Sequence, residues 1–144
     1  MGIPVWLVYA SVTAFFLASA DCFIKLASGR ISSSLGLLIY GACTFATGLG
    51  WVLIERFRAI PLHAQPVAYL YALGVGVSFS AVTVGLYATF GAGAPISLAS
   101  PFVRLAGLVV ASIVGITLFN EPFTGRYVLG MVLIFGGLYL VLTR

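Results

Sequence analysis

Long apolar runs alternate with short polar or glycine- and proline-bearing stretches along the whole chain. Five runs stand out, and they cover residues of about 4–26, 34–54, 66–90, 94–119 and 124–142. A helix needs roughly 20 apolar residues to cross the hydrocarbon core of a bilayer, and each run is about that long. Inside lipid the backbone N–H and C=O groups must be bonded within the segment, so the runs are predicted to be helices. The pattern therefore predicts an all-α integral membrane protein with five transmembrane helices.

The stretches between the runs are short, so successive helices are expected to pack as antiparallel neighbours. Residues 1–144 are accordingly predicted to form a single transmembrane domain. The first run ends in Ala18-Ser19-Ala20, which resembles a signal-peptidase site. Because no Lys or Arg precedes this run and it is long enough to span a bilayer, we expect it to be retained as the first helix. Removal as a signal peptide is the alternative.

Composition excludes a water-soluble protein. Hydrophobic residues make up 62% of the chain and charged residues 7%, whereas about 25% of an average soluble domain is charged. The net charge of +4 comes from Lys and Arg residues that are scattered singly, which argues against nucleic acid as a partner. With one His, no CxxC pair and no glycine-rich phosphate loop, the sequence predicts no metal, no cofactor and no enzymatic activity.

Positive charge is balanced between the two sides of the membrane. Five crossings put the termini on opposite sides. The loops on the N-terminal side carry Arg56, Arg58 and Arg126, and the other side carries Lys25, Arg30 and Arg144. Orientation is normally fixed by an excess of Lys and Arg on one side, and here there is almost none. Two interpretations stay open: copies that insert both ways and pair as an antiparallel dimer, or one orientation that is set by a partner or by small charge biases.

Polar and small side chains recur at helical spacing within four of the runs, the first to the fourth. Residues at i, i+3, i+4 and i+7 share one face of a helix. Such a face either walls a polar cavity or packs against another helix, since small and hydroxylated residues are common at helix contacts in membranes. The residues that could line a cavity are Ser11, Asp21 and Lys25 in the first run, Ser80, Thr83 and Tyr87 in the third, and Ser97, Ser100 and Arg104 in the fourth.

Three of these side chains are charged. Asp21 and Lys25 lie four residues apart near the end of the first run, so they can pair along the helix, either for structure or for function. Arg104 lies about ten residues into the fourth run, or roughly 15 Å deep at 1.5 Å per residue. An arginine at the centre of a spanning helix costs about 2.5–3.5 kcal/mol on insertion, and it usually faces a cavity or a partner. Arg104 is therefore the leading candidate for a functional residue.

A proline lies inside the fourth run, close to Arg104. Pro101 cannot donate a hydrogen bond to the carbonyl of Ser97, so it is expected to act as a kink or hinge. Inside a membrane an interrupted helix is tolerated where the backbone faces protein or water. Together with Ser100 and Arg104, the proline suggests a polar cavity wall. A kink that only shapes helix packing is the competing interpretation.

The end of the chain resembles a known family. TLFNEPFTGRYVLGMVLIFGGLYLVL is similar to the closing signature of the drug/metabolite transporter superfamily, EamA-type branch, in which a Glu-Pro turn leads into a glycine-bearing last helix. Glu121 and Pro122 fall on the turn, and Thr124, Gly130 and Gly136-Gly137 fall on the pattern that follows. GLYATFGAGAPISLASPFVRLAG and DCFIKLASGRIS also resemble stretches of that family. The resemblance covers essentially the whole chain.

This resemblance implies a fold and a partner. Full-length members have ten spans in two inverted five-helix halves, with the substrate between the halves. The chain resembles one half, so a second copy or a homologous five-helix subunit is expected to complete it. The resemblance also implies a multi-pass protein of the cell inner (cytoplasmic) membrane. In the family the first, third and fourth helices wall the cavity, which is where the candidate residues above lie.

The resemblance implies a transporter or exporter of small metabolites. Relatives that export lipophilic cations carry a Glu within the first helix, and nothing acidic lies between Pro4 and Ala20. An arginine in the cavity would instead favour anionic or zwitterionic substrates. A flippase, or flippase subunit, for lipid-linked polyprenyl-phosphate substrates is the second expectation, because such subunits share a similar Glu-Pro turn. A non-transporting membrane scaffold is the third.

Overall fold

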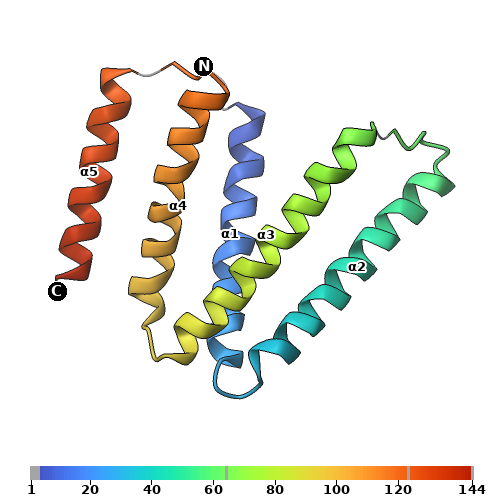
Figure 1. Cartoon of the computed structure of the whole chain (residues 1–144), viewed down its shortest axis with the longest axis horizontal. Helices are drawn as coiled ribbons and strands as arrows, with labels where there is room; N and C mark the ends of the chain where they lie inside the picture. Colours follow the sequence, from blue (N-terminus) through green and yellow to red (C-terminus); the bar gives the residue numbers. More distant parts are fainter. Residues whose placement is uncertain (1–3, 64, 123, 144) are drawn as a thin grey trace. The chain divides into compact units, whose positions relative to one another are not determined.

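The computed structural model describes residues 4–63, 65–122 and 124–143, and it is dominated by five long helices. In chain order they are α1 Val5–Ala27, α2 Ser33–Phe57, α3 Pro66–Gly91, α4 Ile96–Leu118 and α5 Gly125–Leu142 (Figure 1). Each is long and apolar enough to cross a membrane. The prediction of an all-helical chain with five membrane-spanning helices is therefore confirmed for the described residues. Arg144, which was counted among the charges of one side, lies outside them.

Local sequence signals set most of the helix ends. The Ser32 hydroxyl caps α2 by accepting a hydrogen bond from the Leu35 N–H, and Thr124 caps α5 in the same way through Tyr127. These caps bond backbone donors that have no partner within the helix. The polar stretch from Glu55 was expected to lie beyond the second helix, but α2 continues to Phe57. The Trp51 Nε1–H donates to Glu55 Oε1 at 2.9 Å, which bonds the carboxylate within the last turns of the helix.

The end of α2 forms a Schellman motif around a residue with left-handed backbone. The Ile60 N–H donates to the Glu55 carbonyl at 3.0 Å, and the Ala59 N–H donates to the Arg56 carbonyl at 3.1 Å. Ala59 has φ of 54°. Glycine usually occupies this position because a Cβ is strained there. The turn therefore carries a local strain that glycine would remove.

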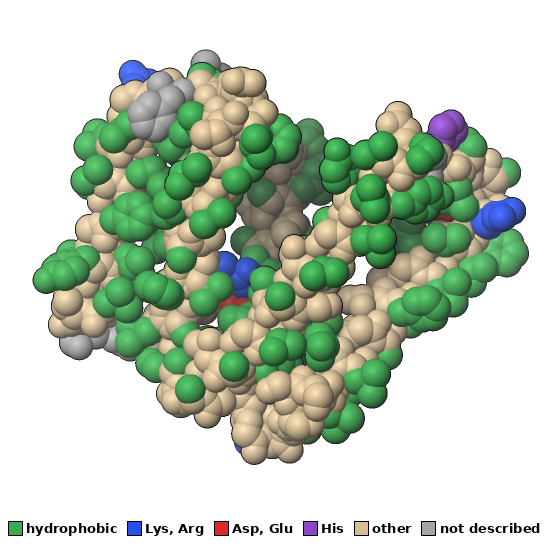
Figure 2. All heavy atoms as spheres, viewed as in Figure 1, with side chains coloured by type: hydrophobic (Ala, Val, Ile, Leu, Met, Phe, Trp, Pro, Cys, Tyr) green, Lys and Arg blue, Asp and Glu red, His purple; other side chains and the backbone are tan. Residues whose placement is uncertain are grey.

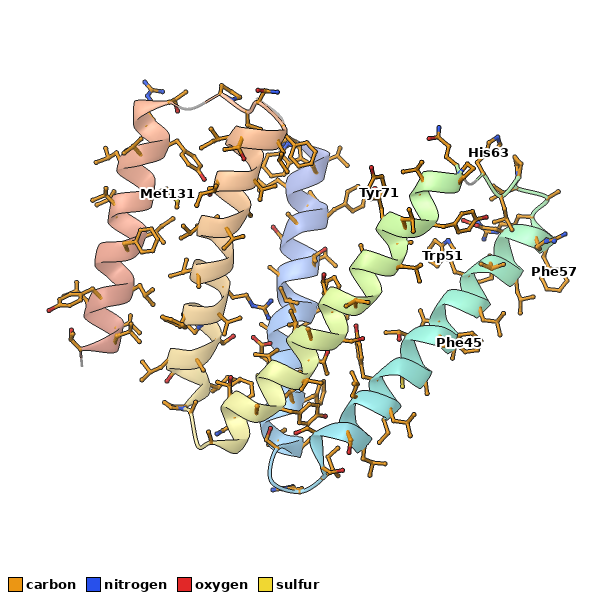
Figure 3. All side chains as sticks on the ribbon, viewed as in Figure 1. Phe45, Trp51, Phe57, His63, Tyr71 and Met131 are labelled. Atoms are coloured by element: carbon orange, nitrogen blue, oxygen red, sulfur yellow. The ribbon has the colours of Figure 1, made fainter. Side chains whose placement is uncertain are left out.

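The helices fall into two compact units. One contains α1 up to Asp21 together with α4 and α5, and the other contains the end of α1 from Cys22 together with α2 and α3. In the second unit α2 packs against α3 through Gly36, which lies directly under the Tyr87 ring. A Cβ at residue 36 would lie 2.5 Å from Tyr87 Cζ, so a larger residue there requires the Tyr87 ring or one of the helices to shift. Phe45 and Phe57 point away from α3 (Figure 3).

In the first unit α4 packs beside α5. The Ser112 hydroxyl donates to the Leu108 carbonyl at 2.7 Å, so its oxygen is left to accept a hydrogen bond from the Tyr127 hydroxyl on α5. Met131 extends from α5 toward α4 (Figure 3). A hydrogen bond between helices is worth about 0.6 kcal/mol on average inside a membrane. The α4–α5 pair is therefore held by packing together with the modest Ser112–Tyr127 bond.

Large hydrophobic side chains cover the outer faces of both units (Figure 2). Phe15, Phe45 and Leu70 are each about 70% exposed, and among the described residues only Leu86, Phe90 and Ala99 are buried hydrophobic ones. In water such surfaces would aggregate. Lipid or another membrane protein must cover them, which agrees with a multi-pass membrane protein.

Gly36→Ala is expected to destabilise the chain by about 1–3 kcal/mol, because the added methyl group collides with the Tyr87 ring and forces α2 away from α3. The free energy of unfolding in mixed micelles titrated with SDS measures the effect. Gly41→Ala is the matched control, since a Cβ there meets nothing within 4 Å. Equal stability of the two variants would contradict the close contact between Gly36 and Tyr87.

Ala59→Gly is expected to stabilise the chain by about 1 kcal/mol, because glycine removes the cost of a Cβ in left-handed backbone. The same unfolding titration measures it. Ala81→Gly within α3 is the control and should destabilise by about 0.5–1 kcal/mol, since glycine weakens a helix interior. Destabilisation by Ala59→Gly would show that the α2 end differs from the motif described.

Candidate functional site

A buried carboxylate lies at the centre of the candidate site. Asp21 on α1 is 1% exposed. Nη2 of Arg104 on α4 is 2.8 Å from each of its two carboxylate oxygens. The Ser100 hydroxyl, one turn earlier on α4, donates to Asp21 Oδ2. A buried charge is tolerated where it is paired and hydrogen-bonded, and this one has both kinds of partner.

Only one of the three guanidinium nitrogens of Arg104 forms these hydrogen bonds. Its Nη2 also approaches the Leu17 carbonyl, one turn before Asp21, at 3.3 Å. Within residues 4–63, 65–122 and 124–143, no hydrogen bond involves its Nε or Nη1. The side chain is 34% exposed, whereas that of Asp21 is 2% exposed. Arg104 therefore keeps two donor nitrogens, which lie on different edges of the guanidinium and could each donate to an anion.

The two charged residues lie at similar depth within their helices. Arg104 is about 12 Å along α4 from Ile96, and Asp21 is about 9 Å from the end of α1 at Ala27. The sequence placed Arg104 at roughly 15 Å, and the difference arises because α4 begins two residues later than expected. Both groups remain inside segments long and apolar enough to cross a membrane. The ion pair therefore lies within the predicted hydrocarbon region.

The helix α4 runs without interruption through Pro101. Proline removes one hydrogen bond, to the carbonyl of Ser97, and the helix continues on both sides of it. The half-buried Pro101 lies one residue after Ser100, and the exposed Ser97 lies one turn nearer the start of α4. The role of Pro101 as a hinge and that of Ser97 in a cavity stay predictions.

Two hydroxyl groups that the sequence placed in the cavity are bonded within their own helices. The Ser11 hydroxyl donates to the Leu7 carbonyl at 2.8 Å and is exposed. The buried Thr83 hydroxyl donates to the Phe79 carbonyl at 2.9 Å. Serine and threonine bond to the preceding turn readily, which removes their donor from other uses. A polar stripe in the sequence therefore overestimates the number of hydroxyl groups that can donate a hydrogen bond to a substrate or to another helix.

The remaining candidates belong to the second unit. Lys25 holds its ammonium group 5.6 Å from the centre of the Phe90 ring, which is a cation–π contact. The Tyr87 ring covers Gly36, and Ser80 lines an open groove on α3. The ion pair of Asp21 is formed with Arg104. The structure thus brings together Asp21, Ser100 and Arg104 from the predicted set.

The Glu-Pro turn forms a compact end to α4. The Glu121 N–H donates to the Gly115 carbonyl at 3.1 Å, and Asn120 has φ of 51°. A Cβ at residue 115 would lie 2.6 Å from Glu121 Oε2, so Gly115 leaves room for the carboxylate. Pro122 follows and is exposed. In this structure Glu121 has a structural role at the turn between α4 and α5.

Sequence reasoning missed the bond between Ser112 and Tyr127. Ser112 stands alone in an apolar run and Tyr127 follows a turn, so neither belonged to a polar stripe. The available signal was that a lone serine within a membrane helix often bonds to a neighbouring helix. As to metals, no group of three or more His, Cys, Asp or Glu side chains suitable for an ion occurs in the described part of the chain.

Comparison with known proteins gave no match: no family model, no curated protein and no solved structure matches the chain. The candidate site is therefore defined by its own geometry.

Arg104→Gln is expected to destabilise the chain by about 3–5 kcal/mol, because it leaves the buried Asp21 carboxylate unpaired, and Asp21→Asn by less, because Arg104 is partly exposed. The double variant removes both charges and should be more stable than the sum of the two single effects predicts. A double-mutant cycle on the free energy of unfolding measures this coupling. The exposed Arg126→Gln should change stability by less than about 0.5 kcal/mol. Additive single effects would contradict a direct pair.

Proposed function

We propose that the chain is a membrane transporter or exporter of small anionic or zwitterionic metabolites. The observation that carries the proposal is the Asp21–Arg104 ion pair with Ser100, set within two apolar helices. Ionisable residues inside membrane helices are rare, and they commonly mark the path of a substrate or ion. A purely structural tie between α1 and α4 could be built from small or apolar side chains at lower insertion cost.

The chemistry of the pair fits a small substrate with a carboxylate or phosphate group. Nε and Nη1 of Arg104 point to different edges of the guanidinium, so each could donate one hydrogen bond to such a group, and a bidentate contact would require Nη2 to be shared with Asp21. Asp21 already neutralises part of the arginine charge, so a bound anion would not meet a full positive charge. A weakened, exchangeable interaction suits a transporter, which must release what it binds.

The proposed active form is a dimer of five-helix subunits in the cell inner membrane. Two considerations support it. The sequence resembles half of a ten-helix transporter of the drug/metabolite type, in which the cavity lies between the halves. The outer faces of the helices are also apolar and exposed, so they can accept a second copy or a homologous subunit. The balanced Lys and Arg counts favour an antiparallel arrangement of two copies.

A flippase for lipid-linked polyprenyl-phosphate substrates is the second candidate. Arg104 would bind a phosphate headgroup as readily as a free anion. The open groove on α3 favours this candidate specifically, because a flippase needs a surface along which a lipid tail can remain in the bilayer. The transporter and the flippase differ in the substrate that they move. In both, the Arg104 donors would bind the anionic group of that substrate.

Transport by the double variant Asp21→Asn/Arg104→Gln separates a substrate role from a structural one. We expect it to fold, since no buried charge is left unpaired, and to lose at least tenfold in transport rate, since the guanidinium is gone. Proteoliposomes loaded with labelled amino acids, dicarboxylates or sugar phosphates provide the measurement. Arg126→Gln, with one arginine fewer at an exposed position, should transport at the wild-type rate.

Other outcomes would contradict this proposal. Wild-type transport by the double variant would make the pair structural. Movement of a polyprenyl-phosphate probe, with none of the soluble probes moved, would favour the flippase. Wild-type protein that moves no probe of either kind would leave a scaffold as the better description.

A further inference from the structure

Both edges of the Arg104 guanidinium that can bind an anion through two hydrogen bonds include Nη2. A carboxylate or phosphate bound in this way lies either across Nη1 and Nη2 or across Nε and Nη2. Nη2 has two hydrogens, and three acceptors already lie near it: the two carboxylate oxygens of Asp21 at 2.8 Å and the Leu17 carbonyl at 3.3 Å. A substrate anion and Asp21 therefore compete for one nitrogen.

Displacement from Nη2 leaves the Asp21 carboxylate without its counter-charge. Asp21 is 1% exposed, so little water can replace the lost partner. A buried carboxyl group in this situation becomes neutral by taking a proton, because an unpaired ion is far more costly to bury than the neutral acid. The anion on Arg104 also places a second negative charge beside Asp21, and two like charges in one site favour protonation of one of them. Anion binding at Arg104 and proton uptake at Asp21 are therefore linked.

Few other charges act on the Asp21 carboxyl group. Arg104 is the only charged residue of α4, so this helix offers no second cation. On α1 the next charge along the sequence is Lys25, one turn further on, and its ammonium group lies 5.6 Å from the centre of the Phe90 ring. The charges that act on Asp21 are thus Arg104, Lys25 and, in the loaded site, the anion itself.

Asp21 is also the one acidic residue in the interior of a helix. The chain has three acidic residues in all. Glu55 lies in the last turn of α2 and accepts a hydrogen bond from Trp51, and Glu121 lies in the turn after α4. A proton that accompanies an anion to Arg104 can therefore be held at Asp21, whereas the other two carboxyl groups lie outside the site.

Ser100 can bond to Asp21 in both protonation states. In the structure its hydroxyl donates to Asp21 Oδ2. A protonated carboxyl group instead needs an acceptor, and the Ser100 oxygen becomes one when its own O–H turns to a carbonyl of the preceding turn. Ser112 on the same helix has this arrangement, since it donates to the Leu108 carbonyl and accepts from Tyr127. Rotation of one hydroxyl group is therefore enough to keep the neutral acid bonded.

We propose that Asp21 takes up one proton when a substrate anion binds two nitrogens of Arg104, so that the chain moves the anion and the proton together. The proton comes from water on the side where the anion enters. An O–H bond forms on Asp21 as its ion pair with Arg104 breaks, and release on the other side reverses both steps. The empty site and the site loaded with a monoanion then carry the same net charge. The inference rests on the proposed transport function and adds the ion to which transport is coupled.

Proteoliposomes that contain wild-type protein test this coupling, with labelled glutamate, succinate and glucose 6-phosphate as probes. Valinomycin and equal potassium concentrations on both sides hold the membrane potential near zero. When the outside is more acidic by about one pH unit, coupling of one proton to one anion should concentrate a transported probe about tenfold inside. Pyranine in the lumen should report protons that enter with the probe in equal number.

Asp21→Asn resembles the protonated acid but cannot release a proton. We expect its accumulation of the probe under the same pH gradient to fall from about tenfold to none. Exchange of labelled for unlabelled probe at equal pH should still be detectable, because exchange needs only the loaded site, which the amide resembles. Glu55→Gln is the matched control. It removes another carboxylate, keeps the oxygen that accepts from Trp51, and should accumulate the probe as wild type does.

Other results separate this inference from the proposed function. If wild-type protein exchanges a probe but does not accumulate it, or Asp21→Asn accumulates it as wild type does, the coupling is wrong and transport stands. Accumulation on the acidic side would show that proton and anion move in opposite directions, which also overturns the inference. If wild-type protein moves none of the three probes, the proposed function fails and the inference fails with it. Should Asp21→Asn fail to fold or to exchange, the wild-type proton count decides, and entry of the probe without protons overturns the coupling.

Discussion

The carboxylate of Asp21 is buried within the protein, so its hydrogen-bond partners must come from the protein, and the contact between α1 and α4 depends on that constraint. Arg104 and Ser100 supply its partners, and both lie on one face of α4 because they are four residues apart. Each charge offsets the insertion cost of the other, since an isolated ion inside a membrane is far more expensive than a bonded pair. The pair therefore fixes how the first unit is assembled, and it leaves half of the guanidinium open.

The helices could be predicted well because a membrane span is recognised from the length and composition of one continuous stretch of sequence. Apolar length gives the span, and residues such as Ser32, Thr124 and Pro66 mark its ends. The site could be predicted only in part. The local pairing of Asp21 with Lys25 could be read from a spacing of four, whereas Arg104 lies 83 positions from Asp21, and its choice of partner depends on which helices pack. In a membrane every face of a helix is apolar, so the sequence does not say which face meets which neighbour.

Glycines in the helices have two different surroundings. Gly36 and Gly115 are occupied, one by the Tyr87 ring and the other by the Glu121 carboxylate, so their small size permits a contact within the chain. Gly76 faces open space. Small residues that look equivalent in the sequence thus serve close packing at two positions and leave a groove at the third.

The helices differ in length, so they fit a bilayer of given thickness to different degrees. α5 has 18 residues and spans about 27 Å, slightly less than a typical hydrocarbon core, whereas α3 has 26 residues and spans about 39 Å. The longer helix can tilt to bring its apolar surface within lipid, but the shorter one has no length to spare. A thicker membrane must therefore thin locally around α5. Because the Tyr127 hydroxyl of α5 is bonded to Ser112 of α4, a shift of α5 in the bilayer would pull on the helix that carries Arg104.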